Sequence, residues 1–178
     1  MKENHKGDFR ESCIKSLKFV SRFSKYNNDK KIVDNLYNLL NNLQAKNVLL
    51  YLPLGMEVNV LPLIKRLRRE KNVQVYVPFM FEDSFKVVPY RLPLIKKRFG
   101  IKEPNNSFVK TKIDVAIVPV VGIDGAFKRI GFGKGMYDRF FGRLNYTPTK
   151  IFIQRKLCQT SQIITDHYDI QADYIITS

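Results

Sequence analysis

A short stretch rich in glycine and positive charge carries the clearest chemistry in this sequence of 178 residues. Residues 129–139 read Arg-Ile-Gly-Phe-Gly-Lys-Gly-Met-Tyr-Asp-Arg. Gly131, Gly133 and Gly135 alternate, so the backbone can adopt positive φ angles and bring its N–H groups close to a ligand without Cβ atoms in the way. Lys134 adds a positive charge at the same place. We interpret the stretch as a loop that binds phosphate.

The residues around this loop favour the same interpretation. Arg129 precedes it, and residues 136–141 are typical of a short helix, whose N-terminus attracts anions. A P-loop does not fit, because it requires Ser or Thr after its lysine and Gly135 stands there. The dinucleotide fingerprint also fails, since the glycines run G-x-G-x-G and no acidic residue follows at a strand end about twenty positions later. A tight strand-to-helix turn with a solvated lysine is the alternative.

The complete stretch resembles the signature of the 5-formyltetrahydrofolate cyclo-ligase (methenyltetrahydrofolate synthetase) family. That signature reads approximately F-D-x-x-G-x-R-L-G-x-G-x-G-Y-Y-D, and this chain has Ile123 and Asp124 followed by residues 129–138. Met136 stands where the family has Tyr, and Ile123 stands where it has Phe. Methionine is apolar and cannot replace the hydrogen bond of a phenol. The resemblance extends from Lys6 nearly to the last residue.

The resemblance implies an ATP site built from two segments. Lys6 and Arg10 lie one turn apart on one face of an expected helix, where alone they would be surface charge. They match a Lys-x-x-x-Arg pair with which the family reaches the ATP phosphates. The implied ATP-binding residues are Lys6, Arg10, Arg129, Ile130, Gly131, Phe132, Gly133, Lys134, Gly135, Met136 and Tyr137. Arg129, Lys134 and Tyr137 are the implied catalytic residues.

A folate site is implied at a strand end. Residues 51–57 resemble the family's strand-to-glutamate junction, which assigns Leu52 and Glu57 to substrate binding. Tyr137 is implied as a further substrate contact. The position of Glu57 agrees with this assignment, because open α/β sheets bind ligands at the carboxyl ends of their strands.

Two aspartates are candidate metal ligands. Asp138 ends the loop signature, and Asp169 matches the first aspartate of the family's closing H-D-x-x-x-D-x-V-V segment, which residues 167–176 resemble with the histidine displaced by one. Carboxylate oxygens are ligands that Mg²⁺ takes together with phosphate oxygens. We therefore expect ATP as co-substrate and Mg²⁺ as cofactor. Residues 99–104 also resemble a family segment, F-G-I-x-E-P.

The reaction implied by the resemblance activates an amide oxygen. The γ-phosphoryl group of ATP would pass to the formyl oxygen of 5-formyltetrahydrofolate, and N10 of the same folate would attack the activated carbon. Loss of phosphate would give 5,10-methenyltetrahydrofolate, with ADP as the other product. The closure is intramolecular and therefore favourable. Two alternatives stay open: a nucleotide-binding relative without turnover, and a basic nucleic-acid-binding module, although the chain shows no base-reading motif.

The expected elements form one α/β domain over residues 1–178. A β-branched run at residues 113–121 predicts an interior strand that leads into the loop. Other strands are predicted at residues 48–52, 73–77, 85–90 and 150–154. Helices are predicted up to residue 23 and at residues 30–44, 60–70 and 136–144, the second one capped by residues 27–29. This order predicts a three-layer domain with a mostly parallel open sheet flanked by helices.

Composition limits the remaining possibilities. The net charge is +15, from 31 basic and 16 acidic residues, which suits anionic substrates, a nucleic-acid surface or a basic proteome. No apolar run approaches the roughly 18 residues of a membrane span, and the first residues lack a signal peptide's apolar stretch. We expect a cytoplasmic monomer without nucleic-acid or membrane partners. Candidate contacts for a folate polyglutamate tail are Lys65, Arg66, Arg68, Lys96 and Lys97.

Cysteine and histidine contribute little to the expected chemistry. Cys13 and Cys158 lie far apart in the sequence, so we predict reduced, partly buried thiols. His5 and His167 are too sparse for a histidine-rich zinc site.

Overall fold

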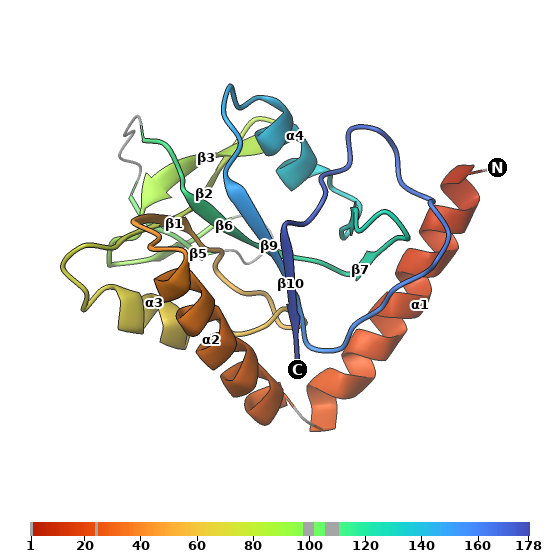
Figure 1. Ribbon diagram of the computed structural model, residues 1–178, viewed down its shortest axis with the longest axis horizontal. Coiled ribbons are helices and arrows are strands. Elements are labelled where there is room, and N and C mark those ends of the chain that lie inside the picture. The colour runs from red at the N-terminus through yellow and green to blue at the C-terminus, as the bar shows by residue number, and fades with distance from the viewer. Residues whose placement is uncertain (1, 24, 98–101, 106–110) are drawn as a thin grey trace.

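A six-stranded sheet forms the centre of the molecule (Figure 1). The computed structural model describes residues 2–23, 25–97, 102–105 and 111–178. Neighbouring strands pair in parallel, except for the antiparallel pair β2 and β3. The sheet order is β10-β9-β6-β1-β2-β3, with bounds β1 Asn47–Leu49, β2 Gln74–Phe81, β3 Ser84–Pro89, β6 Val115–Pro119, β9 Thr149–Gln154 and β10 Tyr174–Thr177. The mostly parallel sheet expected from the sequence is confirmed.

The strands that follow β1 in sequence are added first on one side of β1 and then, from β6 onward, on its other side. From β1 the chain crosses to β2 on one side, whereas β6 pairs with the other side of β1 and leads on to β9 and β10. Val48 of β1 lies beside both Val75 of β2 and Val115 of β6. Parallel sheets bind ligands at the carboxyl ends of two strands whose connections leave in opposite directions. The segments after β1 and β6 therefore border the expected site.

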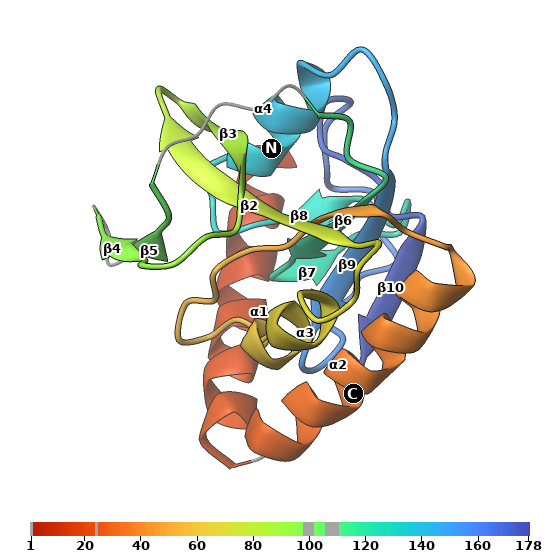
Figure 2. The ribbon, with the colours of Figure 1, turned by 90° about the vertical axis from the view of Figure 1, so that its left-hand side faces the viewer.

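Helices cover both faces of the sheet (Figure 2). α2 (Lys25–Asn42) and α3 (Leu61–Leu67) cover one face, where Leu36 and Ile64 pack against strand residues such as Ile117. α4 (Met136–Gly142) covers the other, where Phe140 packs with Phe152. The three-layer α/β architecture is thus confirmed. α1 (Lys2–Phe23) lies at one side of the sheet beside β7 (Figure 1).

β2 continues past Pro78, where the sequence predicted its end. Its pairing with β1 stops at Tyr76, and from Pro78 onward it pairs only with β3. A proline in a strand is tolerated where no neighbour needs its N–H. β2 can therefore extend to Phe81 and form a hairpin with β3.

α2 begins earlier than expected. The sequence predicted a helix start at residue 30 with residues 27–29 as caps, but the helix already starts at Lys25. Asp29 lies inside the helix and is 6% exposed. Its carboxylate pairs with the buried Arg155, at 2.6 Å between Oδ1 and Nε. The cap assignment was wrong because the Asp29 carboxylate accepts hydrogen bonds from the distant Arg155 and not from the N–H groups at the start of the helix.

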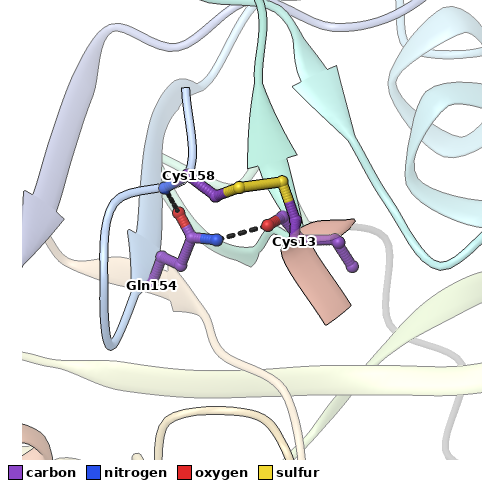
Figure 3. Close-up of a disulfide and its surroundings, with 4 residues drawn as sticks. Cys13, Gln154 and Cys158 are labelled. Atoms are coloured by element: carbon purple, nitrogen blue, oxygen red, sulfur yellow. Dashed lines mark hydrogen bonds between the residues drawn. A yellow bond between two sulfur atoms is a disulfide. The ribbon is translucent and has the colours of Figure 1, made fainter. Parts of the chain in front are cut away.

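A disulfide joins Cys13 of α1 to Cys158 in the segment after β9 (Figure 3). The prediction of reduced thiols is therefore wrong, since folding brings together two cysteines separated by 145 positions. Gln154 supports the junction: its Oε1 accepts a hydrogen bond from the Cys158 N–H at 2.9 Å, and its Nε2 donates to the Val121 carbonyl. α1 is thus covalently tied to the edge of the sheet where the strands end.

Two small ribbons complete the described structure. β7 (Gly122–Ile123) pairs with β8 (Arg129–Ile130), and β4 (Ile95–Lys96) pairs with β5 (Lys102–Glu103). Positions 99–101 of the 99–104 family segment lie outside the described residues. None of the helices in the described ranges is long and apolar enough to cross a membrane.

Loss of the disulfide is expected to destabilise the fold. Cys13→Ser should lower the free energy of unfolding by about 2–4 kcal/mol, because the unfolded chain regains a long closed loop. Urea denaturation followed by circular dichroism measures this change. Adding reductant should lower the stability of the wild type to a similar extent and leave the variant unchanged. If reductant leaves the free energy of unfolding of the wild type unchanged, the expectation is contradicted.

Candidate active site

The glycine-rich loop links β8 to α4 and has the backbone that the sequence predicted. Gly133 and Gly135 have positive φ angles of 95° and 61°, which non-glycine residues rarely adopt. At Gly131 the reason is space, because a Cβ there would lie 2.4 Å from Nη1 of Arg129. Lys134 is exposed in the loop. The loop therefore keeps its backbone accessible to a ligand and presents a cation beside it.

The side chain of Arg129 lies between the glycine-rich loop and the core and holds the two ends of this region together. The side chain is buried, with Nε and Nη2 donating to the carbonyl of Pro119 at 3.2 and 3.1 Å. Nη1 lies 3.4 Å from Oδ2 of Asp138, and the guanidinium lies 4.9 Å from the centre of the Tyr137 ring. Arg129 thus connects the end of β6 with the first turn of α4 and brings positive charge under the loop.

α1 contributes both cations that the family resemblance singled out. Nε of Arg10 donates to the carbonyl of Gly131 at 2.9 Å. Nζ of Lys6 forms an ion pair with Asp169 and lies 3.4 Å from Oδ2 of Asp166. Burial lowers the pKa of Lys6, but the two carboxylates outweigh this effect and raise it above its ordinary value. The predicted pair therefore meets the loop and the closing segment, two parts of the chain remote from α1 in sequence.

The two candidate metal ligands lie close together. Oδ1 of Asp138 accepts a hydrogen bond from the N–H of Ile170 at 3.2 Å, directly after Asp169. Oδ2 of Asp169 accepts from the N–H of Asp166 at 2.8 Å and pairs with Lys6. Within the described ranges, no group of three or more His, Cys, Asp or Glu side chains could hold a metal ion. Two carboxylates suit a magnesium ion that arrives with nucleotide phosphates, because Mg²⁺ takes most of its other ligands from phosphate and water.

Glu57 reaches the same region from the end of β1. Its Oε2 accepts a hydrogen bond from the N–H of Leu54 at 2.7 Å. Burial raises the pKa of Glu57 above its ordinary value, and the Leu54 N–H and two nearby arginines only partly oppose this shift. Glu57 and Phe132 of the loop line one small cavity, together with Leu17 of α1 and residues at the ends of β6 and β9. Leu52, in contrast, packs against the core under α2 and α3.

Tyr137 connects the Glu57 side of the site with the loop side. Burial raises its pKa well above the ordinary tyrosine value, and the negative charge of Glu57 adds to the shift, while Arg129 opposes it. The phenol is therefore protonated at neutral pH and can donate a hydrogen bond. Its neighbour Met136, which replaces the family's Tyr, packs against the core cluster under α4.

Asp124 is a structural residue of the site that the sequence showed only as part of the motif. It is fully buried between β7 and β8. Oδ1 accepts from the N–H groups of Ala126 and Lys128 at 2.9 and 3.0 Å, and Oδ2 accepts from the N–H and hydroxyl of Thr165. Burial raises the pKa of Asp124, but these hydrogen bonds prevail and lower it below its ordinary value. Asp124 thus joins the turn before the loop to the closing segment.

Arg155 is a further residue of the site that the sequence did not predict. It directly follows the predicted strand at residues 150–154, and this position was the only signal in the sequence; the burial of the side chain is visible only in the structure. Its acidic partner Asp29 was expected to be a helix cap. An ion pair between positions 126 apart has no local pattern from which it could be predicted.

Comparison with known proteins identifies relatives along nearly the whole chain. Residues 2–178 match the model of the 5-formyltetrahydrofolate cyclo-ligase family. The chain is 26% identical over 172 residues to a 5-formyltetrahydrofolate cyclo-ligase of Mycoplasma pneumoniae, covering 96% of this chain and 97% of the relative. It is 29% identical over 154 residues to the Haemophilus influenzae protein of the same name, covering 80% and 81%.

Solved structures agree with these sequence matches. The 5,10-methenyltetrahydrofolate synthetase of Aquifex aeolicus superposes with a TM-score of 0.81 at 26% identity, covering 97% of this chain and 89% of that one. The 5,10-methenyltetrahydrofolate synthetase of Mycoplasma pneumoniae superposes with a TM-score of 0.74 at 27% identity, covering 96% and 97%. The fold and the sequence therefore point to the same family.

Replacement of Asp124 is expected to destabilise the region around the loop. Asp124→Asn should lower the free energy of unfolding by about 2 kcal/mol at neutral pH, because an amide cannot accept all four hydrogen bonds. Since the folded pKa lies below the ordinary value of 3.8, the carboxylate stabilises the fold above that pH, and this contribution disappears as pH falls below it. Urea denaturation from pH 7 downward should show a weaker acid dependence in the variant. The exposed Asp8→Asn is the matched control, and equal losses in both variants would refute this role.

Proposed function

Because this chain belongs to the 5-formyltetrahydrofolate cyclo-ligase family, we propose that it converts 5-formyltetrahydrofolate to 5,10-methenyltetrahydrofolate and that ATP becomes ADP and phosphate in the same reaction. The observation that carries this proposal is the meeting of Glu57 and the glycine-rich loop at one cavity. A site for a folate and a site for phosphates must adjoin if a phosphoryl group is to pass between the two substrates.

We propose that ATP occupies the loop side of the site. Lys6, Arg10 and Lys134 bring cations from α1 and the loop, and the loop N–H groups add hydrogen-bond donors, a combination that suits a triphosphate. Asp138 and Asp169 would hold Mg²⁺ together with phosphate oxygens, and the ion would neutralise phosphate charge. The ammonium of Lys6 now pairs with Asp169, so binding of the nucleotide would let Lys6 exchange this carboxylate for a phosphate.

The folate would lie on the Glu57 side. Glu57 would accept hydrogen bonds from the folate, and the protonated Tyr137 would donate one near the boundary between the two substrates. The packing of Leu52 in the core supports an indirect contribution to this side, through the backbone that leads to Glu57.

The chemistry then follows from orientation and charge. The formyl oxygen attacks the γ-phosphorus and ADP leaves; N10 then attacks the formyl carbon and loses its proton to solvent, and phosphate departs with that oxygen. Arg129 and Lys134 would stabilise negative charge that develops on the transferred group. The protein supplies no covalent nucleophile in this scheme. It holds the formyl oxygen near the γ-phosphate and excludes water that would otherwise accept the phosphoryl group.

Four features of the protein expected from its sequence stay predictions. They are a single domain over residues 1–178, a cytoplasmic monomer, the absence of nucleic-acid partners, and capture of a polyglutamate tail by basic residues outside the loop. Two of the tail candidates have aromatic neighbours: Arg66 lies over the Tyr37 ring at 3.2 Å and Arg68 lies over the Tyr90 ring at 5.2 Å.

Lys134→Ala tests the phosphate loop. The variant should lose turnover by a factor on the order of 10² and bind ATP more weakly, because the loop loses its point charge beside the phosphates. Turnover is measured as the ATP-dependent rise of methenyl-folate absorbance near about 360 nm, which the folate itself provides. Lys71→Ala is the matched control, since Lys71 is exposed just before β2, at the opposite end of the strands. Equal kinetics of Lys134→Ala and the control would overturn the phosphate-loop assignment.

Glu57→Gln tests the folate side. The variant should raise the KM for 5-formyltetrahydrofolate about tenfold and leave the KM for ATP within a factor of about two, because only the folate would contact this side chain. In the wild type, the folate KM should also rise as the pH falls through the raised pKa of Glu57, since the carboxylate becomes protonated. The glutamine variant should lack this pH dependence. A selective loss of ATP binding would show that the assignment of Glu57 is wrong.

A further inference from the structure

A buried arginine lies behind the segment that carries Glu57. Arg155 is 1% exposed and directly follows β9. Its guanidinium is paired with the carboxylate of Asp29 in a fork, at 2.6 Å from Nε to Oδ1 and 3.0 Å from Nη2 to Oδ2. A charge at this depth requires such a partner, because transfer of an unpaired ion from water to the interior is strongly unfavourable.

Three further hydrogen bonds of this pair hold the backbone around Glu57, and a fourth runs from Nη1 of Arg155 to the hydroxyl of Ser21 in α1 at 2.8 Å. Nη1 of Arg155 donates to the carbonyl of Met56 at 2.8 Å, and Nη2 donates to the carbonyl of Glu57. On the acidic side, Oδ2 of Asp29 accepts from the N–H of Asn59 at 3.0 Å. The ion pair therefore contacts the chain before, at and after Glu57.

The planar shape of the guanidinium determines where two successive carbonyl groups lie. A hydrophobic pair of similar volume could fill the same space without loss of stability, but it would leave these backbone groups unrestrained. The Glu57 side chain itself has one local hydrogen bond, to the Leu54 N–H. Its direction into the cavity therefore depends on the backbone on which it stands, and Arg155 lines that cavity as well.

We infer that the Arg155–Asp29 pair is a positioning element for substrate binding: it aims Glu57 at the folate without touching the folate. The inference rests on the proposed function, since it assumes that Glu57 binds the folate. It assigns a functional reason to a charge pair whose net contribution to stability is expected to be small. The consequence is expected mainly on the folate side, because the ATP side uses α1, the loop and α4, and the pair contacts these elements only through Ser21, about 16 Å along α1 from Arg10.

The decisive variant is Arg155→Lys, which keeps the charge but lacks the fork. We expect the KM for 5-formyltetrahydrofolate to rise roughly tenfold or more, since small displacements of a binding group weaken binding strongly. The KM for ATP should stay within a factor of about two. In the Glu57→Gln background, the same change should raise the folate KM by less than about twofold, because a residue that acts through Glu57 has no further effect once that carboxylate is gone.

A charge-free variant separates positioning from stability. Arg155→Met combined with Asp29→Leu should retain the wild-type unfolding midpoint in urea within about 1 M and still show the raised folate KM. A folded double variant with the wild-type folate KM would overturn the inference. If the double variant does not fold, the Arg155→Lys variant provides the test through its KM values for folate and ATP. A larger increase for folate supports positioning, and equal increases for folate and ATP would count against it. A wild type that produces no methenyl-folate would instead refute the proposed function, and the inference with it.

Discussion

The parallel pairing of β1 with β6 is the constraint on which the site depends. Because the two strands run in the same direction, both deliver the chain to one edge of the sheet, one towards Glu57 and the other towards the glycine-rich loop. The connections then leave in opposite directions and keep the space between them accessible. The register is well determined, since Val48 packs into the core under α2 and α3 while Leu49 packs into the core under α4. A shift by one residue would exchange these faces.

Paired charges organise the site around that edge. Lys6 pairs with Asp169, Arg129 with Asp138, and Arg155 with Asp29, and each pair joins segments that are distant or lie in different elements. Ion pairs of this kind add little net stability when buried, because desolvation offsets the attraction. Their value here is positional. They hold cations at the edge of the sheet before a substrate arrives, and in two of the pairs the acidic partner is a candidate metal ligand.

Local patterns predicted most elements but not all of their boundaries. The β-branched run before the loop predicted β6, and helical spacing of apolar residues predicted α1, α2 and α3; residues 136–144 were also predicted to be helical. The early start of α2, the extension of β2 past Pro78 and the disulfide were missed. Two of these depend on a partner far away in sequence, Arg155 for Asp29 and Cys158 for Cys13, whereas the second half of β2 depends on pairing with the adjacent strand β3. Short hairpins such as β7 and β8 have too few residues to show a period.

The sequence by itself determined the chemistry of this protein, because residue types and their spacing in the loop are local properties that a chain shows without folding. The alternating glycines, the lysine among them and the aspartate that follows were sufficient to indicate a phosphate site and a family. Only the tertiary structure decided how the parts meet: that α1 reaches the loop through Arg10, that Glu57 and Phe132 share one cavity, and that Arg155 stands behind Glu57. These contacts join positions up to 121 residues apart, and they form because burying apolar faces brings the segments together. Hydrogen bonds and ion pairs then select one arrangement among those that burial allows.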